Sequence, residues 1–274
     1  MKRRVDLVLV ERGLVESRAK AQAMIMAGKV FSGERRVGKA GELVGDDAAL
    51  AVRGADHPWV SRGGVKLAHG IGHFGLSPRG KVCLDIGAST GGFTDVLLDQ
   101  GAARVYAVDV GQGQLDWRLR HDPRVVVMEK TNARYLTAEQ VPEPVEVLVC
   151  DASFIGQRVL LPAPLALCAP GAWAIVLIKP QFEAGVALVS AGRGVIRDPA
   201  VHRAVCGEVA CWWNGLPGWR VLGVEESPIT GPEGNREFLL AAQHEAAPSR
   251  AGMLDRPPSG RAGSPGDDAI WDRT

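Results

Sequence analysis

The sequence predicts a doubly wound α/β fold with a mostly parallel sheet, preceded by a small α+β module at the amino terminus. Short apolar runs recur between residues 67 and 244 and alternate with stretches that suit helices. A glycine-rich turn follows the first run, and charged residues stand at the ends of several others. Because ligands bind at the carboxyl ends of strands in such sheets, these charged residues indicate a candidate site.

The charge of the chain is unevenly distributed. Its 274 residues are 46% hydrophobic, enough for one large and one small core, and the net charge is +1. Residues 1–66, however, contain 13 Lys and Arg against 8 Asp and Glu, a charge of +5. Two interpretations explain this uneven charge equally well. Residues 1–66 bind an anionic partner, or they form a basic surface that is only solvated.

Cysteine and histidine usage predicts no metal site. The five cysteines form no Cys-x-x-Cys pair, so we expect reduced, mostly buried thiols in a cytoplasmic protein. The six histidines show no recognised ligand spacing, which favours structural or solvent-facing roles. The chain starts without a signal peptide, and the uncharged stretch Leu160–Ile178 contains prolines that predict a helix, a turn and a strand instead of a membrane span.

The amino-terminal module, residues 1–56, has helical patterns at Val5–Arg12 and Ser17–Ala27, followed by strand-like pieces. Ser17 is the predicted N-cap of the second helix, and Arg18 and Lys20 fall in its first turn. Positive charges there oppose the helix dipole. The pattern therefore predicts an anionic ligand for this helix.

The module resembles the S4 RNA-binding domain through Arg4-Val5-Asp6, Leu9 to Leu14, Ser17 to Ala21, Gly28-Lys29-Val30 and Lys39-Ala40-Gly41. In that domain, a helix pair and the following loop present basic side chains to folded RNA. Phosphate contacts supply affinity without sequence choice. The resemblance implies RNA contacts from Arg4, Arg18, Lys20, Lys29, Arg35, Arg36 and Lys39.

A semi-rigid connector is predicted at 57–66, where Pro58 fixes φ and Trp59 can pack on a neighbouring surface. The α/β domain follows at 67–244, and its last two strands form a hairpin around Pro228–Gly234. The tail at 245–274 is rich in Pro, Ser and Gly, which predicts disorder. Strands are predicted near 81–86, 104–109, 124–129, 146–151, 172–179, 219–225 and 235–242.

The glycine-rich turn predicts a nucleoside cofactor. Glycines let the backbone approach a ligand, and the helix start offers unpaired N–H groups. The second strand ends in Asp109, placed for ribose hydroxyls, and the glycine spacing differs from the dinucleotide pattern. We therefore predict S-adenosylmethionine, although each carboxylate alone is as well explained as a turn cap. The predicted cofactor-binding residues are Asp85, Gly87, Ala88, Ser89, Thr90, Gly91, Gly92, Phe93, Asp109, Val110, Asn132, Ala133 and Asp151.

Four charged residues are candidates for catalysis: Lys66 on a helix before the first strand, Asp151 and Lys179 at strand ends, and Glu237 in the last strand. Charges beside apolar elements are costly unless they meet one another or a ligand. Their arrangement resembles the Lys-Asp-Lys-Glu set of FtsJ-type ribose 2′-O-methyltransferases. The alternative for Lys66 and Glu237 is a surface ion pair.

With further motifs at Asp109–Leu115, Lys179–Glu183 and Gly234–Phe238, residues 1–243 resemble the TlyA family. The resemblance implies a Rossmann-like methyltransferase sheet and S-adenosylmethionine-dependent methylation of cytidine 2′-hydroxyls in ribosomal RNA. Members of the family have also been called haemolysins. Two other hypotheses stay open: a small-molecule methyltransferase with an interaction module, and a membrane-active protein, which lacks a wide amphipathic basic helix here.

Lys179 is the best candidate base for the ribose hydroxyl. An unperturbed lysine is neutral in only about one molecule in 2,500 at pH 7. Burial and the neighbouring cation Lys66 would lower its pKa, whereas Asp151 and Glu237 would favour the charged form. In the alternative, Lys179 stays charged and only positions the hydroxyl. The sequence leaves both open.

Overall fold

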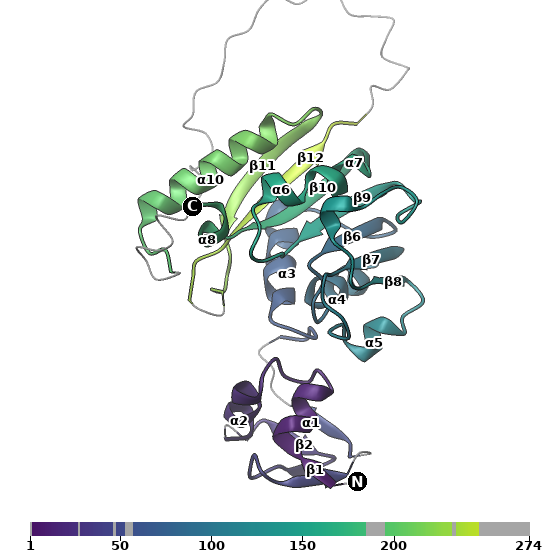
Figure 1. Cartoon of the computed structure of the whole chain (residues 1–274), viewed down its shortest axis with the longest axis vertical. Helices are drawn as coiled ribbons and strands as arrows, with labels where there is room; N and C mark the ends of the chain where they lie inside the picture. Colours follow the sequence, from purple (N-terminus) through teal and green to yellow (C-terminus); the bar gives the residue numbers. More distant parts are fainter. Residues whose placement is uncertain are drawn as a thin grey trace, which may run out of the picture.

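The computed structural model describes residues 2–26, 28–45, 48–52, 57–184, 195–231 and 234–246. A small amino-terminal module lies next to a larger α/β domain built around one sheet (Figure 1). Apart from Glu245 and Ala246, the predicted tail lies outside the described residues.

The large domain contains a seven-stranded sheet of order β11-β12-β10-β9-β6-β7-β8. Strands β6 to β10 are parallel, whereas β12 runs antiparallel to both β10 and β11. All seven predicted strands and the closing hairpin are confirmed, as is the mostly parallel sheet. The strands are β6 (Val82–Ile86), β7 (Arg104–Val108), β8 (Val125–Met128), β9 (Val145–Cys150), β10 (Cys168–Ile178), β11 (Trp219–Glu226) and β12 (Phe238–His244).

One strand boundary was wrong in the prediction. Strand β12 begins at Phe238, so Glu237 lies in the loop immediately before it. That loop is held by backbone hydrogen bonds from Ser227 N to Glu237 O, at 2.9 Å, and from Gly231 N to Asn235 O, at 2.8 Å. The last register pair of β11 and β12 is Glu226 with Phe238, and Glu237 follows it in the loop with one further backbone hydrogen bond.

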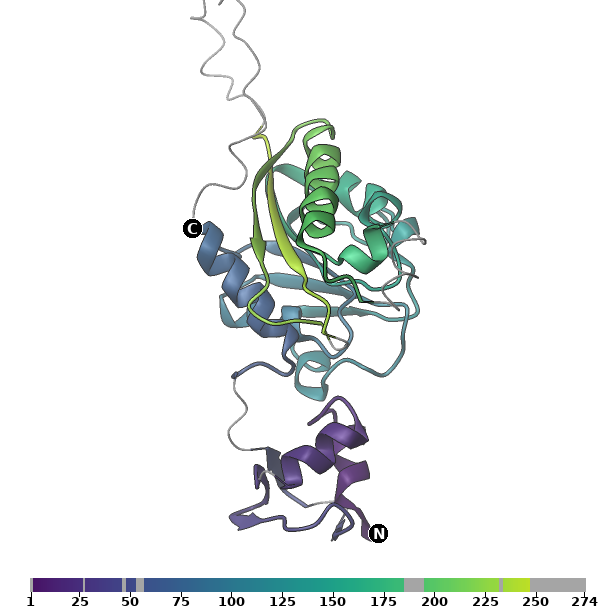
Figure 2. The ribbon, with the colours of Figure 1, turned by 90° about the vertical axis from the view of Figure 1, so that its left-hand side faces the viewer.

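Helices cover both faces of the sheet, which makes the fold doubly wound (Figures 1 and 2). One face carries α3 (Gly63–Phe74), α4 (Gly92–Asp99) and α5 (Trp117–Arg120). The other face carries α6 (Gln157–Leu160), α7 (Pro162–Ala166), α8 (Pro180–Glu183), α10 (Pro199–Asn214) and the 3-10 turn η1 (Ala133–Tyr135).

Two hydrophobic cores result, because successive side chains of a strand face opposite sides. On β9, Val147 packs into the core with Leu97 of α4, whereas Leu148 packs into the core with Trp213 of α10. Trp213 is fully buried, and its Nε1 donates to Gln157 Oε1 at 2.8 Å. Full burial of such a side chain contributes about 1.5–3 kcal/mol or more to stability.

The amino-terminal module has a separate small core that includes Val5, Leu9 and Ile25. Both predicted helices are present, and Ser17 caps the second by accepting a 3.2 Å hydrogen bond from Lys20 N. Strand β1 was not predicted, because three residues give no periodicity and it forms only by pairing with β4. The elements are β1 (Lys2–Arg4), α1 (Val5–Glu11), α2 (Arg18–Met26), β2 (Val30–Ser32), β3 (Arg35–Arg36), β4 (Leu43–Gly45) and β5 (Leu50–Val52).

The connector is fixed to the α/β domain. The Trp59 ring packs so closely on Gly64 that a Cβ there would lie 2.3 Å from it, and Val60 N donates to Asp95 Oδ2 at 2.8 Å. Helix α3 begins at Gly63, so the last four residues assigned to the connector are helical. The start of α3 is thereby held against α4.

The stretch that resembled a membrane span folds as the end of α6, then α7, then strand β10. None of the helices in the described part of the chain is long and apolar enough to cross a membrane. All five cysteines are free, and Cys83, Cys150 and Cys206 are buried.

Candidate active site

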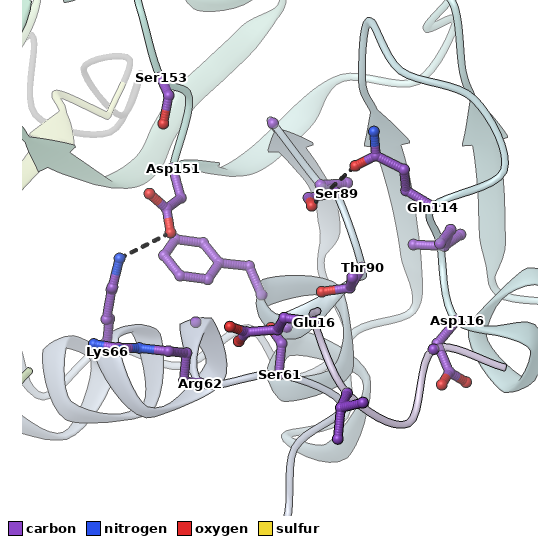
Figure 3. A pocket seen from close by; sticks show the side chains of 18 of the residues that line it. Glu16, Ser61, Arg62, Lys66, Ser89, Thr90, Gln114, Asp116, Asp151 and Ser153 are labelled. Atoms are coloured by element: carbon purple, nitrogen blue, oxygen red, sulfur yellow. Dashed lines mark hydrogen bonds and ion pairs between the residues drawn. The ribbon is translucent and has the colours of Figure 1, made fainter. Parts of the chain in front are cut away.

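A cavity of about 1300 Å³ opens at the carboxyl ends of β6, β9 and β10 (Figure 3). The residues that follow these strands, Gly87, Asp151 and Lys179, all line it. Helix α3 contributes Lys66, and the loop before β12 contributes Glu237. The four predicted catalytic residues thus meet at one site, although they come from four separate elements.

Asp151 joins the two lysines of this tetrad. Its Oδ1 lies 2.6 Å from Lys179 Nζ, and its Oδ2 lies 3.2 Å from Lys66 Nζ. Lys66 Nζ also lies 2.6 Å from Glu237 Oε2. The alternative of a surface pair does not hold for Lys66 and Glu237, because both side chains are buried.

The two lysines differ in their electrostatic surroundings. Burial lowers the pKa of Lys66, but the charges and hydrogen bonds of Asp151 and Glu237 outweigh burial and hold this pKa above its ordinary value. Lys179 contacts one carboxylate, that of Asp151, and not Glu237. Lys66 is therefore fixed as a cation by two carboxylates, whereas Lys179 meets one.

Three acceptors surround Lys179 Nζ. Besides the Asp151 carboxylate, it donates to the main-chain carbonyl of Asp151 at 3.1 Å and to Ser153 Oγ at 2.9 Å. An ammonium group has three donors, so this arrangement matches charged Lys179. The side chain is held at the cavity wall in a fixed orientation.

The glycine-rich turn runs along another wall of the cavity. Gly87 has φ of 81°, and a Cβ there would lie 3.0 Å from the Ala152 backbone. Gly91, with φ of 95°, packs under Leu119, where a Cβ would lie 2.3 Å away. The turn thus requires glycine at both positions, and α4 begins directly after it, with first-turn N–H groups that lack intrahelical partners. The predicted residues of the turn that line the cavity are Gly87, Ala88, Ser89, Thr90, Gly92 and Phe93.

The structure does not bring the other predicted cofactor residues to the cavity wall. Asp109 accepts hydrogen bonds from Ser89 N at 2.9 Å and Gly111 N at 2.6 Å, so it ties two loops together beside the cavity. Asn132 caps η1 by accepting from Arg134 N at 3.1 Å. The residues that do not line the cavity are Asp85, Gly91, Asp109, Val110, Asn132 and Ala133.

Asp85 lies buried below the turn. Its Oδ2 accepts a 2.7 Å hydrogen bond from Thr94 Oγ1, and its Oδ1 has no hydrogen-bond partner among the described residues. Burial raises the pKa of Asp85 to about 7, against the opposing effect of the Thr94 hydrogen bonds. This carboxyl therefore binds the first turn of α4 and does not belong to the cavity lining.

Several cavity residues were missed from the sequence. Ser153 binds Lys179, and Phe154 follows it with φ of 66° and 90% exposure. The Phe154 ring lies 5.1 Å from that of Phe182, which also lines the cavity. A positive φ at a bulky residue is strained and marks functional sites. The sequence signal was only the position of these residues directly after Asp151.

The amino-terminal module also contributes to the cavity wall, through residues 10–16 and Leu50. Glu16 and Ser61 come from different parts of the chain and line the same space (Figure 3). Arg62 donates to the Thr230 carbonyl, which ties the start of α3 to the loop before β12. Residues of both domains therefore line the cavity.

The predicted RNA-binding residues are not equivalent. Arg4 and Arg18 both bind the buried carboxylate of Asp6, with nitrogen–oxygen distances of 2.9 Å. Arg4 holds the pKa of Asp6 well below its usual range, and Arg18 adds to this effect. The expectation that only an anionic ligand explains Arg18 was therefore wrong, because Asp6 supplies the negative charge.

The other basic residues of the module face solvent to different degrees. Arg35 pairs with Glu42, and Arg36 packs beside Gly28, while Lys20 and Lys39 are exposed and make no ion pair with any described residue. Lys29 is half-buried. Of the predicted RNA-binding residues, Lys20 and Lys39 are therefore the most available for contacts with a ligand.

Two family models match the chain. The FtsJ-like methyltransferase model matches residues 59–244, and the S4 domain model matches residues 3–49. The fold and site define a methyltransferase of the α/β class with an appended S4 domain. The chain belongs to the FtsJ-like methyltransferase family.

Relatives share nearly the whole length. YqxC of Bacillus subtilis, described as a candidate rRNA methyltransferase, is 48% identical over 87% of this chain and 85% of its own. The 16S/23S rRNA (cytidine-2′-O)-methyltransferase TlyA of Mycobacterium tuberculosis is 46% identical over 92% of this chain and 94% of its own. A solved structure described as a candidate hemolysin of Streptococcus thermophilus is 40% identical, covers 90% of both chains and has a TM-score of 0.71.

Proposed function

We propose that this protein transfers a methyl group from S-adenosylmethionine to the 2′-hydroxyl of cytidine in ribosomal RNA. The buried Lys66-Asp151-Lys179-Glu237 tetrad at the cavity wall is the observation that carries the proposal. The TlyA relative, which covers both domains, supports this substrate. A ribosomal RNA substrate places the activity in the cytoplasm.

The cavity fits the cofactor. Its wall includes the turn at Gly87, where a side chain would meet the Ala152 backbone, and the start of α4. These are features of nucleoside-binding sites, because they allow close approach and offer N–H donors. When bound, S-adenosylmethionine supplies an electrophilic methyl group on a positively charged sulfur. We propose that the cavity-lining residues of the turn hold it, with Asp109 binding the ribose through lone pairs not used by Ser89 and Gly111.

Lys179 is the proposed proton acceptor. In the transfer, the hydroxyl oxygen would bond to the methyl carbon while the carbon–sulfur bond breaks, with its electron pair left on the sulfur of the departing thioether. The hydroxyl proton would pass to a neutral amine at the cavity wall. Lys66 is unsuited to this role, since two carboxylates hold its pKa high. Lys179 contacts a single carboxylate, that of Asp151, and the cation Lys66 contacts the other oxygen of the same carboxylate.

The remaining members of the tetrad position Lys179. Asp151 orients its Nζ through both a side-chain and a main-chain oxygen. Lys66 binds the second carboxylate oxygen of Asp151, and Glu237 in turn binds Lys66. The hydrogen bonds of Nζ suit an ammonium group, so Lys179 has to release a proton before it accepts that of the hydroxyl.

Two further features favour RNA over a small substrate. The amino-terminal S4 domain lines the same cavity, and its Lys20 and Lys39 are available for phosphates. Phe154 holds an exposed ring at the cavity, suited to stacking on the base of the target nucleotide.

The experiment compares Lys179→Arg with Lys179→Met in single-turnover methyl transfer to ribosomal RNA. Arginine keeps the charge but cannot act as a base at accessible pH. Both variants should lose at least about 100-fold in rate while binding cofactor and RNA as the wild type does. Substantial activity in Lys179→Arg alone would assign Lys179 a charged positioning role. Wild-type activity in both would remove it from the mechanism.

A further inference from the structure

A second cluster of titratable side chains lies outside the cavity, where helix α3 packs beside strand β11. His69 and His73 are four residues apart on this helix, and Glu225 comes from strand β11. Glu225 Oε1 lies 3.3 Å from His69 Nε2, and Glu225 Oε2 lies 3.8 Å from His73 Nε2. The cluster therefore joins two elements that are distant in the sequence. The spacing of the histidines alone predicted no metal site, because the third residue, Glu225, is brought to them by the fold.

The geometry of the cluster suits a metal ion. Within the described ranges of the chain, one ring nitrogen of each histidine and a carboxylate oxygen of Glu225 lie within 4.8 Å of one another. Two ligands bound at about 2.1 Å to a tetrahedral ion lie about 3.4 Å apart. The His69–Glu225 separation already has this value, and a side-chain adjustment of His73 completes the set. Histidines at positions i and i+4 place both rings on one side of a helix.

The site is also accessible. The side chains of His69, His73 and Glu225 are 36%, 39% and 31% exposed, so an ion can enter, and water can occupy the remaining coordination positions. The two rings are already close, with centroids 5.9 Å apart, and the His73 ring rests edge-on against Phe74 at 4.7 Å. These contacts already restrict the two side chains, so metal binding costs less side-chain conformational entropy.

We propose that His69, His73 and Glu225 form a binding site for a divalent transition-metal ion, with Zn²⁺ as the probe. Two imidazoles and one carboxylate match the ligand preference of zinc and its neighbours in the first transition row. Such an ion joins α3 to β11. Lys66 of the tetrad lies one turn earlier on α3, and Glu237 directly precedes β12, the partner strand of β11. The ion would therefore help to hold Lys66 and Glu237 in place relative to each other.

The test is calorimetric titration of the metal-stripped full chain with Zn²⁺, in a Cys211→Ser background that removes the exposed thiol. We expect one saturable site. His69→Ala, His73→Ala and Glu225→Gln should each weaken binding by about tenfold or more, given that loss of an outer-shell partner alone costs 10–100-fold. The matched control is His121→Ala, an exposed histidine outside the cluster.

A second readout excludes nonspecific effects. Zn²⁺ should raise the thermal unfolding midpoint of the wild type and of His121→Ala, because the ligands come together only in the folded state, and should leave the His69→Ala/His73→Ala variant unshifted. The variants change half-exposed side chains, so their circular dichroism should match the wild type. Equal zinc affinity in the double variant and the control, or absence of saturable binding to the wild type, would show that the cluster is only a histidine–carboxylate ion pair.

Discussion

Lys66 Nζ lies 2.6 Å from a carboxylate oxygen of Glu237, so helix α3 is joined to the loop that precedes strand β12. Both groups are buried, and each compensates the charge of the other. A buried pair of this kind contributes little net stability when complete, but removal of one partner leaves an uncompensated charge.

We expect Glu237→Gln to lower the free energy of unfolding by about 1–3 kcal/mol, because Lys66 keeps Asp151 as its remaining counter-charge. Lys66→Met introduced into this variant should cost less than Lys66→Met alone. Urea unfolding of the two single variants and the double variant measures this coupling. Additive losses would mean that the 2.6 Å contact has no energetic role.

The pH dependence of stability should report on Asp85. Its folded pKa of about 7 exceeds the ordinary 3.8, so the folded state keeps a proton that the unfolded state releases. The stability that this difference supplies is complete below pH 4 and is lost as the pH rises to 7, with an upper limit of about 4 kcal/mol.

Asp85→Asn lacks this ionisation. The unfolding free energy of the wild type should therefore fall relative to that of the variant between pH 4 and pH 7, and the difference should be constant above pH 8. Urea unfolding at a series of pH values tests this prediction. Parallel curves for the two proteins across the whole range would show that Asp85 is not protonated in the folded state at pH 6.

The S4 domain should supply most of the salt-dependent RNA affinity. Lys20→Ala combined with Lys39→Ala should lower the slope of log affinity against log salt by about 1.4–1.8, the value for two lost phosphate contacts. Lys81→Ala is the control, since Lys81 pairs with Glu146 and directly precedes β6, at the edge of the sheet away from the cavity. An unchanged slope in the double variant would favour a small-molecule substrate.

Arg18→Ala is unsuited to that test, although its position at a helix start first indicated an RNA contact. The Arg18 side chain pairs with buried Asp6, so its removal should destabilise the amino-terminal domain. Loss of RNA binding in this variant would not separate a phosphate contact from unfolding. The double variant therefore combines Lys20 with Lys39, which make no ion pair with any described residue.

The Phe154 ring should matter for RNA and not for the cofactor. Phe154→Gly relieves the strained φ of 66° while it removes the ring, so the loop keeps its shape. We expect RNA methylation efficiency to fall by about 5–150-fold, the equivalent of 1–3 kcal/mol of stacking, with cofactor affinity unchanged. Phe154→Tyr should retain activity. A fully active Phe154→Gly variant would exclude the stacking role.

The strands were predictable because each is a local apolar run, and several are followed by a charged residue. Asp151 and Lys179 could be placed for this reason, since parallel strands bring their carboxyl ends to one edge. Lys66 lies on helix α3, and the resemblance to FtsJ-type enzymes indicated its role. The pairing of Arg18 with Asp6 and the loop position of Glu237 depend on contacts between distant segments. The hydrophobic periodicity of the sequence carries no information about such contacts.

Local geometry explains the other differences. Asp109 and Asn132 stand at the predicted strand ends, yet their side chains accept loop hydrogen bonds and do not belong to the cavity lining. Phe154 owes its exposure to a left-handed backbone conformation that few residues adopt and that the sequence does not signal.

The chemical identity of the product tests the central claim most directly. Unmodified ribosomal subunits are incubated with the purified protein and isotopically labelled S-adenosylmethionine, and the RNA is digested to nucleosides for mass spectrometry. We predict labelled 2′-O-methylcytidine with the wild type and none with Lys179→Met. Label on a nucleobase, or no label in RNA while the folded protein binds the cofactor, would contradict the assignment as a ribose methyltransferase.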